Sequence, residues 1–285
     1  MDRGLAPSRA RAQSLILGGK VRTGVGDAGR VDRKAGDLVD TTIAIALLAR
    51  DPFVGRGGHK LVAALDAFQI NPRNAVCLDV GASTGGFTDV LLQRGARRVY
   101  ALDVGRGQLA EALRHDPRVV SMERTNARGI TASTLPEPIT LATVDVSFIS
   151  LRLVLAPIIS VFGPEGGSIV ALVKPQFEAG RGQVPGGVVR DPAIHRATVE
   201  RVVSFAAISG LVARAVVASP ILGPEGNREF LVHLVVPNTA PGVDATSPAD
   251  ATSQPDANPL ADAIPRAVDP ELLERITLIT EGGAR

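Results

Sequence analysis

The stretch VCLDVGASTGGFTDVLLQRG, residues 76–95, decides the fold. An apolar run ends at Asp79, a loop with Gly81, Gly85 and Gly86 follows, and a helical pattern comes next. Glycines in such a loop permit positive φ angles and let the backbone approach a ligand closely. Open α/β sheets bind ligands beyond the carboxyl ends of their strands. The loop therefore predicts a ligand site at one edge of a sheet.

The segments on both sides of this stretch alternate between short β-branched runs and helical patterns. Such alternation is typical of strands joined by crossover helices, and it predicts a Rossmann-like, doubly wound α/β sheet with parallel strands. The predicted strands cover residues 75–80, 98–103, 119–123, 139–146, 167–173, 212–218 and 230–236, and the predicted helices cover residues 61–68, 86–93, 108–113 and 193–209.

Four regions follow from the composition along the chain. Residues 1–50 are predicted to form a small α+β module. Ser8 would cap a helix over 9–17, Gly18 and Gly19 would end that helix, and a strand would follow over 41–48. Residues 51–59 read as a linker, and residues 60–236 hold the alternating pattern. Residues 237–285 form a low-complexity acidic tail that is predicted to be disordered, most clearly over 238–258, while 269–279 could form a short amphipathic helix.

Charge is unevenly placed although the net charge is only +2. Residues 1–60 carry 11 Lys and Arg against six Asp and Glu, whereas residues 237–285 carry three against eight. A basic segment suits a polyanion such as nucleic acid, because neutralising phosphates releases counterions. An ordinary solvated surface explains the same counts, so charge alone leaves both open.

Composition limits the remaining classes. Cys77 is the single cysteine, which excludes an intramolecular disulfide and argues against a cysteine zinc site. Aromatic residues make up 3% of the chain, too few for a base-stacking platform. The sequence has no apolar run of about 18 residues and no signal-peptide pattern, which predicts a cytoplasmic protein without a membrane span. The single cysteine leads us to expect no metal either.

The loop chemistry favours S-adenosylmethionine as the cofactor. Asp103 ends the second strand about twenty residues after the loop, where a carboxylate can accept bonds from ribose hydroxyls. Asp79 would repel a pyrophosphate but can attract an amino-acid ammonium, and neither the dinucleotide fingerprint nor a P-loop is present. A tight turn without ligand and a nicotinamide dehydrogenase remain as alternatives. The predicted cofactor residues are Asp79, Gly81, Ser83, Thr84, Gly85, Gly86, Phe87, Asp103 and Asn126.

Several motifs together resemble the TlyA family, S4-domain-bearing ribosomal RNA 2′-O-methyltransferases of which some are called haemolysins. The motifs are RGGHKL at 56–61, LDVGASTGGFTD at 78–89, ALDVG at 101–105, VDVSFISL at 144–151, VKPQFE at 173–178 and GNREFL at 226–231. The resemblance implies an FtsJ-type catalytic domain, an N-terminal S4-like RNA-binding module, ribosomal RNA or ribosomal subunits as partner, and a cytidine as target. It also implies a catalytic tetrad of Lys60, Asp145, Lys174 and Glu229.

The implied tetrad agrees with the chemistry of the reaction. A ribose 2′-hydroxyl is a poor nucleophile, so it must be oriented and its proton removed, or its developing charge stabilised. Lys174 and Asp145 end neighbouring strands, and the family resemblance favours Lys174 as the base. The chain has four Lys against 27 Arg, so lysines at two motif positions point to a need for a titratable amine.

RNA contacts are predicted in two places. The basic residues of the N-terminal module would bind phosphates. The target nucleotide would be held by residues near the motifs and by the glycine-rich segment 179–191, which is predicted to be a mobile lid. These residues are Arg9, Arg11, Lys20, Arg22, Arg56, Gln176, Phe177, Arg181 and Arg190. His59 reads as local packing. The alternative functions are a non-catalytic S4-type RNA-binding or ribosome-assembly protein and, disfavoured by the lack of apolar spans, a pore-forming haemolysin.

Overall fold

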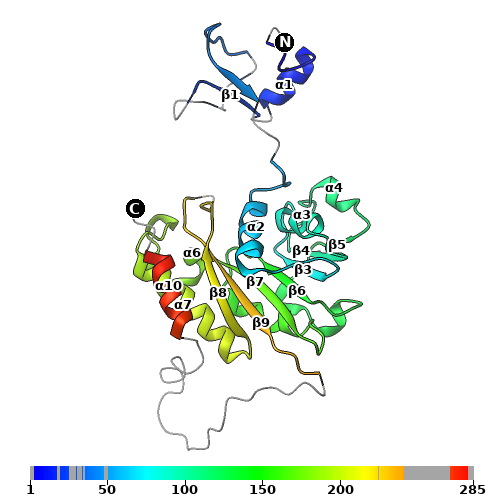
Figure 1. The fold of residues 1–285 in the computed structure, drawn as a ribbon, viewed down its shortest axis with the longest axis vertical. Helices are drawn as coiled ribbons and strands as arrows, with labels where there is room; N and C mark the ends of the chain where they lie inside the picture. Colours follow the sequence, from blue (N-terminus) through cyan, green and yellow to red (C-terminus); the bar gives the residue numbers. More distant parts are fainter. Residues whose placement is uncertain are drawn as a thin grey trace, which may run out of the picture. The chain divides into compact units, whose positions relative to one another are not determined.

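The computed structural model describes residues 3–17, 20–25, 30, 34, 36–47, 51–223, 225–240 and 270–281 (Figure 1). The chain divides into two compact units, Met1–Pro52 and Phe53–Arg285. The boundary corrects the predicted linker over 51–59, because residues from Phe53 onward belong to the second unit. The ring of Phe53 packs edge-on against His59, with the ring centroids 5.2 Å apart. The local packing predicted for His59 is therefore confirmed.

The first unit contains one helix and a two-stranded sheet. Helix α1 covers Arg9–Leu17, and the Ser8 hydroxyl accepts a hydrogen bond from the Arg11 amide at 3.2 Å, as predicted for its cap. Strands β1 (Val21–Thr23) and β2 (Ile45–Leu47) pair antiparallel. The strand predicted over 41–48 is shorter, because Asp40 accepts from the Thr42 amide at 2.7 Å and forms a turn. The Gly18-Gly19 stop lies outside the described residues.

The second unit is built on a seven-stranded sheet with the order β5-β4-β3-β6-β7-β9-β8. Strands β3 to β7 run parallel, whereas β9 lies antiparallel between β7 and β8. The predicted all-parallel sheet is thus corrected to a mixed one, because β8 and β9 are joined by a reversal of the chain: in its described residues, 219–223 and 225–229, it contains turns and no crossover helix. The strands are β3 (Val76–Val80), β4 (Arg98–Leu102), β5 (Val119–Met122), β6 (Leu141–Val144), β7 (Gly167–Val173), β8 (Val212–Ala218) and β9 (Phe230–Val236).

Helices cover both faces of this sheet and define two apolar cores. Strand side chains alternate between the cores, so that Leu78 faces one and Cys77 the other. Helices α2 and α3 pack on the Cys77 side, and α5, α7 and α10 pack on the Leu78 side. The helices are α2 (Gly57–Phe68), α3 (Gly86–Gln93), α4 (Glu111–Arg114), α5 (Leu155–Ile159), α6 (Pro175–Glu178), α7 (Pro192–Ile208) and α10 (Pro270–Glu281).

The last helix, α10, belongs to the core of the second unit. It lies beside α7 in Figure 1, and its Leu272 and Ile276 side chains are buried in the Leu78-side core. The helix predicted over 269–279 is therefore confirmed, and the description of the whole of 237–285 as a disordered tail is wrong for 270–281. The remainder of the segment predicted to be disordered, 241–258, lies outside the described residues. Within the described parts of the chain, no helix has the length and apolarity that crossing a membrane requires.

Candidate active site

The glycine loop lies between the carboxyl end of β3 and the start of α3. Gly81 has φ +82°, and a Cβ at this position would lie 2.5 Å from the carbonyl oxygen of Asp145. Any side chain would therefore force apart the ends of β3 and β6. The Gly81 amide donates to the carbonyl of Leu102 at 2.8 Å, which joins the loop to β4 as well. The loop is thus held between two neighbouring strands, and the positive φ at Gly81 agrees with the glycine pattern.

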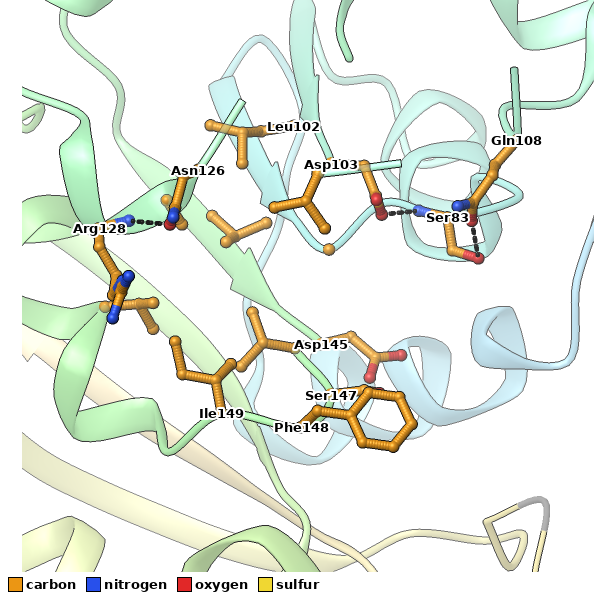
Figure 2. A pocket seen from close by; sticks show the side chains of 16 residues that line it. Ser83, Leu102, Asp103, Gln108, Asn126, Arg128, Asp145, Ser147, Phe148 and Ile149 are labelled. Carbon is orange, nitrogen blue, oxygen red and sulfur yellow. Dashed lines mark hydrogen bonds between the residues drawn. The ribbon is translucent and has the colours of Figure 1, made fainter. Parts of the chain in front are cut away.

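A cavity of about 460 Å³ opens at this edge of the sheet. Four predicted cofactor residues line it: Gly81, Ser83, Asp103 and Asn126. In Figure 2, Asp103 and Asn126 lie on one side of the cavity, and Asp145, Ser147 and Phe148 lie on the opposite side. We call this space the cofactor cavity. Its volume is within the range of small-molecule sites, about 300–1,000 Å³.

Polar groups on the Asp103 side of the cofactor cavity are fixed by the protein itself. The Asp103 carboxylate accepts from the Ser83 amide at 2.8 Å and from the Gly105 amide at 2.7 Å. The Ser83 hydroxyl bonds to Gln108, and Asn126 accepts from the Arg128 amide at 3.0 Å, the bonds drawn in Figure 2. This side is therefore preorganised, and carboxylate oxygens, which accept more than one bond each, can still meet ligand hydroxyls.

The other predicted loop residues divide into two groups. Thr84, Gly86 and Phe87 line a small adjoining cavity of about 130 Å³. Gly85, by contrast, faces away from the ligand space: it has φ +96°, and a Cβ there would lie 2.2 Å from Leu113. Its glycine is needed for the turn and for packing against α4.

Asp79 is buried beneath the loop and does not line the cofactor cavity. Its side chain is fully inaccessible and accepts hydrogen bonds from the Thr88 hydroxyl at 2.7 Å and the Thr143 hydroxyl at 2.9 Å. Burial raises the pKa of Asp79 to about 6, although both hydroxyls favour the ionised form. Asp79 joins β3 to β6 and α3, and its attraction of a cofactor ammonium, through water or directly, stays a prediction.

A second cavity of about 650 Å³ adjoins the first, and Lys60, Asp145, Lys174 and Glu229 all line it. We call it the reaction cavity. Lys60, on α2, forms a buried ion pair with Glu229, at the start of β9. Lys174, at the end of β7, lies 2.6 Å from Asp145, at the end of β6. The four residues proposed from the motifs are thus brought together as two ion pairs.

The two cavities share one wall. Gly81, Ser83, Asp145, Ser147 and Phe148 line both of them. A group bound in the cofactor cavity would therefore reach the space beside Lys174 along the Asp145 side.

Two buried oxygen atoms of the reaction cavity lack a hydrogen-bond partner among the described residues: Gln176 Oε1 and Glu229 Oε1. Asp145 Oδ1, by contrast, is paired with the Lys174 amine at 2.6 Å, and the same amine donates to the Ser147 hydroxyl at 2.8 Å. Buried acceptors without partners are rare in proteins and destabilising. Their clustering here indicates a site that receives donors from a bound molecule.

Two residues of the shared wall were not singled out from the sequence. Ser147 accepts the Lys174 hydrogen bond, and Phe148 is 90% exposed with a φ of +63°, which is strained for an aromatic residue. The Phe148 ring lies 5.0 Å from that of Phe177, measured between centroids. Both residues lie in the VDVSFISL motif, but neither the positive φ nor the exposure can be read from residue types.

The predicted RNA contacts fall in different places. Arg56, Gln176 and Phe177 line the reaction cavity. Arg9 and Arg11 are exposed on α1, and Lys20 and Arg22 are partly buried at and beside β1. Arg190 is exposed just before α7, and the backbone of Arg181 begins a short 3-10 helix.

The donor set of the cofactor cavity fits S-adenosylmethionine. Asp103 and Asp145 supply negative charge toward a ligand that carries an ammonium and a sulfonium and has no phosphate. The Asp103 carboxylate is positioned by two backbone amides, as a ribose-binding group requires. Among the residues that the structure describes, no group of three or more His, Cys, Asp or Glu is arranged to hold a metal ion.

Comparisons with known proteins agree with this geometry. The family model "FtsJ-like methyltransferase" matches residues 53–235. "16S/23S rRNA (cytidine-2'-O)-methyltransferase TlyA" of Mycobacterium tuberculosis is 49% identical over 234 residues, covering 81% of this chain and 86% of that protein. "Hemolysin A" of Brachyspira hyodysenteriae is 42% identical, with 82% and 96% covered. A solved structure described as a hemolysin from Streptococcus thermophilus is 42% identical, covers 84% of this chain and 86% of that one, and has a TM-score of 0.67.

Proposed function

Because this chain belongs to the TlyA family of FtsJ-like, S-adenosylmethionine-dependent methyltransferases, we propose that it methylates the ribose 2′-hydroxyl of a cytidine in ribosomal RNA. The observation that carries the proposal is the meeting of two lysine–carboxylate pairs in one cavity beside the cofactor cavity. The names of the relatives support ribosomal RNA and cytidine as the target. Such a substrate would place the reaction in the cytoplasm.

Lys174 is the proposed base. Its amine is directed by the Ser147 hydroxyl at 2.8 Å and by Asp145 at 2.6 Å, so it is oriented before RNA binds. In its neutral form, Lys174 would take the 2′-hydroxyl proton at Nζ as the oxygen attacks, a role that contributes about 10²–10⁴-fold in enzymes. S-adenosylmethionine, when bound, supplies an electrophilic methyl group on a sulfonium.

Lys60 and Glu229 are proposed to orient the substrate. Their buried pair puts a cation and the unpartnered Glu229 oxygen on the wall of the reaction cavity. The ribose hydroxyls and an exocyclic base amine are donors of the kind that such an acceptor would receive. Phe148 and Phe177 present apolar surface to the same cavity, and Arg56 brings a positive charge.

The N-terminal unit is proposed to act as an S4-like RNA-binding module. Its support is the basic excess in residues 1–52, nine Lys and Arg against six Asp, and the exposure of Arg9 and Arg11 on α1. Removing it should lower affinity for RNA and leave cofactor binding unchanged.

The test is transfer of a labelled methyl group from S-adenosylmethionine to ribosomal RNA or ribosomal subunits. The wild-type protein should transfer label, and Lys174→Ala should not, although it still binds the cofactor. Mass spectrometry of the digested RNA should find the methyl group on a ribose. A methyl group on a base would contradict the proposed reaction, and a methylated ribose at another nucleoside would contradict the cytidine target.

A further inference from the structure

Part of the reaction-cavity wall is formed by a glycine-rich turn, residues 184–189, that carries none of the tetrad residues. Val184 and Gly187 of this turn line the cavity. Gly187 has φ +80°, and a Cβ there would lie 3.1 Å from the Glu225 carboxylate, another cavity residue. The turn is in contact with the loop that precedes β9, so the two segments together form this part of the cavity wall.

Asn227 joins the two segments. Its side chain is 1% exposed and does not line the cavity, yet both ends of its amide are used. The amide oxygen accepts from the Val189 N–H at 2.9 Å, and the amide nitrogen donates to the Gly187 carbonyl at 2.9 Å. Two bonds from one buried, rigid amide fix both the distance and the orientation of the turn.

The turn is also held from its other side. The Val189 carbonyl lies 3.0 Å from Nε2 of His195, a buried residue of α7. Because a carbonyl only accepts, Nε2 is the donor in this bond. The peptide groups flanking Val189 are therefore fixed by Asn227 on one side and by His195 on the other.

Asn227 is connected to the tetrad through the backbone. Its carbonyl accepts from the Gly223 amide at 2.9 Å, and a Cβ at Gly223 would lie 2.6 Å from Oε1 of Glu229. The loop thus packs tightly around the carboxylate of Glu229, which pairs with Lys60 and lies two residues after Asn227 in the sequence. A shift of the Asn227 side chain would move the cavity wall and this carboxylate together.

We propose that Asn227 is a positioning residue, which sets the distance between the 184–189 turn and Glu229 and so shapes the cavity for its RNA nucleotide. The identity of the bound molecule rests on the proposed function, whereas the mechanical role of Asn227 does not.

The experiment compares the wild type with Asn227→Ala and the nearly isosteric Asn227→Asp, which keeps an acceptor for Val189 but no donor for Gly187. Three quantities are measured: KM for ribosomal RNA, Kd for S-adenosylmethionine, and the rate of tryptic cleavage at Arg190, read by mass spectrometry. For Asn227→Ala we expect RNA KM and Arg190 cleavage to rise at least about tenfold, with cofactor Kd changed less than about twofold. Asn227→Asp should change the same two quantities in the same direction.

Ile276→Ala is the control, since it removes a buried side chain of α10 away from both cavities. It should lower the Tm without a selective rise in Arg190 cleavage or RNA KM. Unchanged RNA KM and Arg190 cleavage in both Asn227 variants would overturn the inference, as would an equal loss of cofactor and RNA binding. If the wild type transfers no methyl group to RNA, the proposed function fails, whereas the cleavage result still decides whether Asn227 holds the turn.

Discussion

The Asp103 side of the cofactor cavity and the reaction cavity differ in how their polar groups are satisfied. On the cofactor side, Asp103 and Asn126 already hold backbone amides of the protein. In the reaction cavity, two buried oxygens, on Gln176 and Glu229, have no partner among the described residues, and the charged groups form two lysine–carboxylate pairs. The first region is complete before a ligand arrives, and the second is completed by its ligand.

This difference fits the molecule that each region would bind. S-adenosylmethionine is small and constant, so a rigid site binds it without further ordering. An RNA nucleotide must be taken from a larger structure and discriminated, and unpaired buried acceptors penalise a wrong nucleotide strongly. Substitutions in each region should therefore affect cofactor binding and methyl transfer separately.

The largest effect is expected for Lys174→Ala. Methyl transfer should fall by about 10²–10⁴-fold, because the proposed base is removed. Cofactor Kd, measured by calorimetry, should stay within about twofold, since Lys174 lines only the reaction cavity. A comparable loss of cofactor affinity would show that the two regions are not separable.

Glu229→Gln should lower both the rate of methyl transfer and the stability of the fold. The substitution leaves Lys60 buried opposite a neutral amide, and breaking a buried pair in this way destabilises by about 3–5 kcal/mol. Urea unfolding gives the stability change, and single-turnover methylation gives the activity. The double variant Lys60→Met with Glu229→Gln should recover part of the stability but no activity. Recovery of activity would remove the pair from the proposed mechanism.

Asp79→Asn should change the pH dependence of stability and not the chemistry. Burial raises the pKa of Asp79 to about 6, above its value near 3.9 in an unfolded chain. The folded state therefore holds the proton more tightly, so this residue's stabilising contribution is full below pH 4 and declines by about 3 kcal/mol as the pH rises through 6. The difference in unfolding free energy between wild type and Asp79→Asn should fall by that amount from pH 4 to pH 7. A flat or rising difference would contradict the buried assignment.

Asp103→Ala should produce the smallest effect, confined to the cofactor. Losing hydrogen bonds to a charged group removes about 1.5–3 kcal/mol, which corresponds to about a 10–100-fold rise in cofactor Kd. The rate at saturating cofactor should fall by less than about threefold. Gln108→Ala is a suitable control: the neutral Gln108 side chain bonds the Ser83 hydroxyl, and its loss should change the cofactor Kd by a few fold at most. A large loss of the saturated rate in Asp103→Ala would mean that this side also shapes the reaction cavity.

The sequence predicted the parts of the structure that depend on local pattern. The bounds of α3, β7, β8 and β9 agree with the predicted ranges, because each is a short periodic run between turn residues. The four tetrad positions were predicted through motifs, and the structure brings them to one cavity. The pairing of Lys60 with Glu229 joins residues 169 apart in sequence, which no local pattern specifies.

Features that depend on tertiary packing were not predictable. The antiparallel insertion of β9 between β7 and β8 reflects pairing of distant strands, and β9 has the same apolar composition as a parallel strand. Asp79 has the position of a ligand-binding residue, but the hydroxyls that occupy it come from Thr88 and Thr143, on two other elements. The positive φ and the exposure of Phe148 likewise have no counterpart in its residue type.

The burial of α10 has a practical consequence for anyone who shortens this protein. The family match ends at residue 235, before α10 begins at Pro270. A chain cut there would lose Leu272 and Ile276 and leave an apolar strip of α7 and β8 open to water. Exposed apolar strips of this kind promote self-association, so such a fragment should be recovered as aggregates where the longer chain is not.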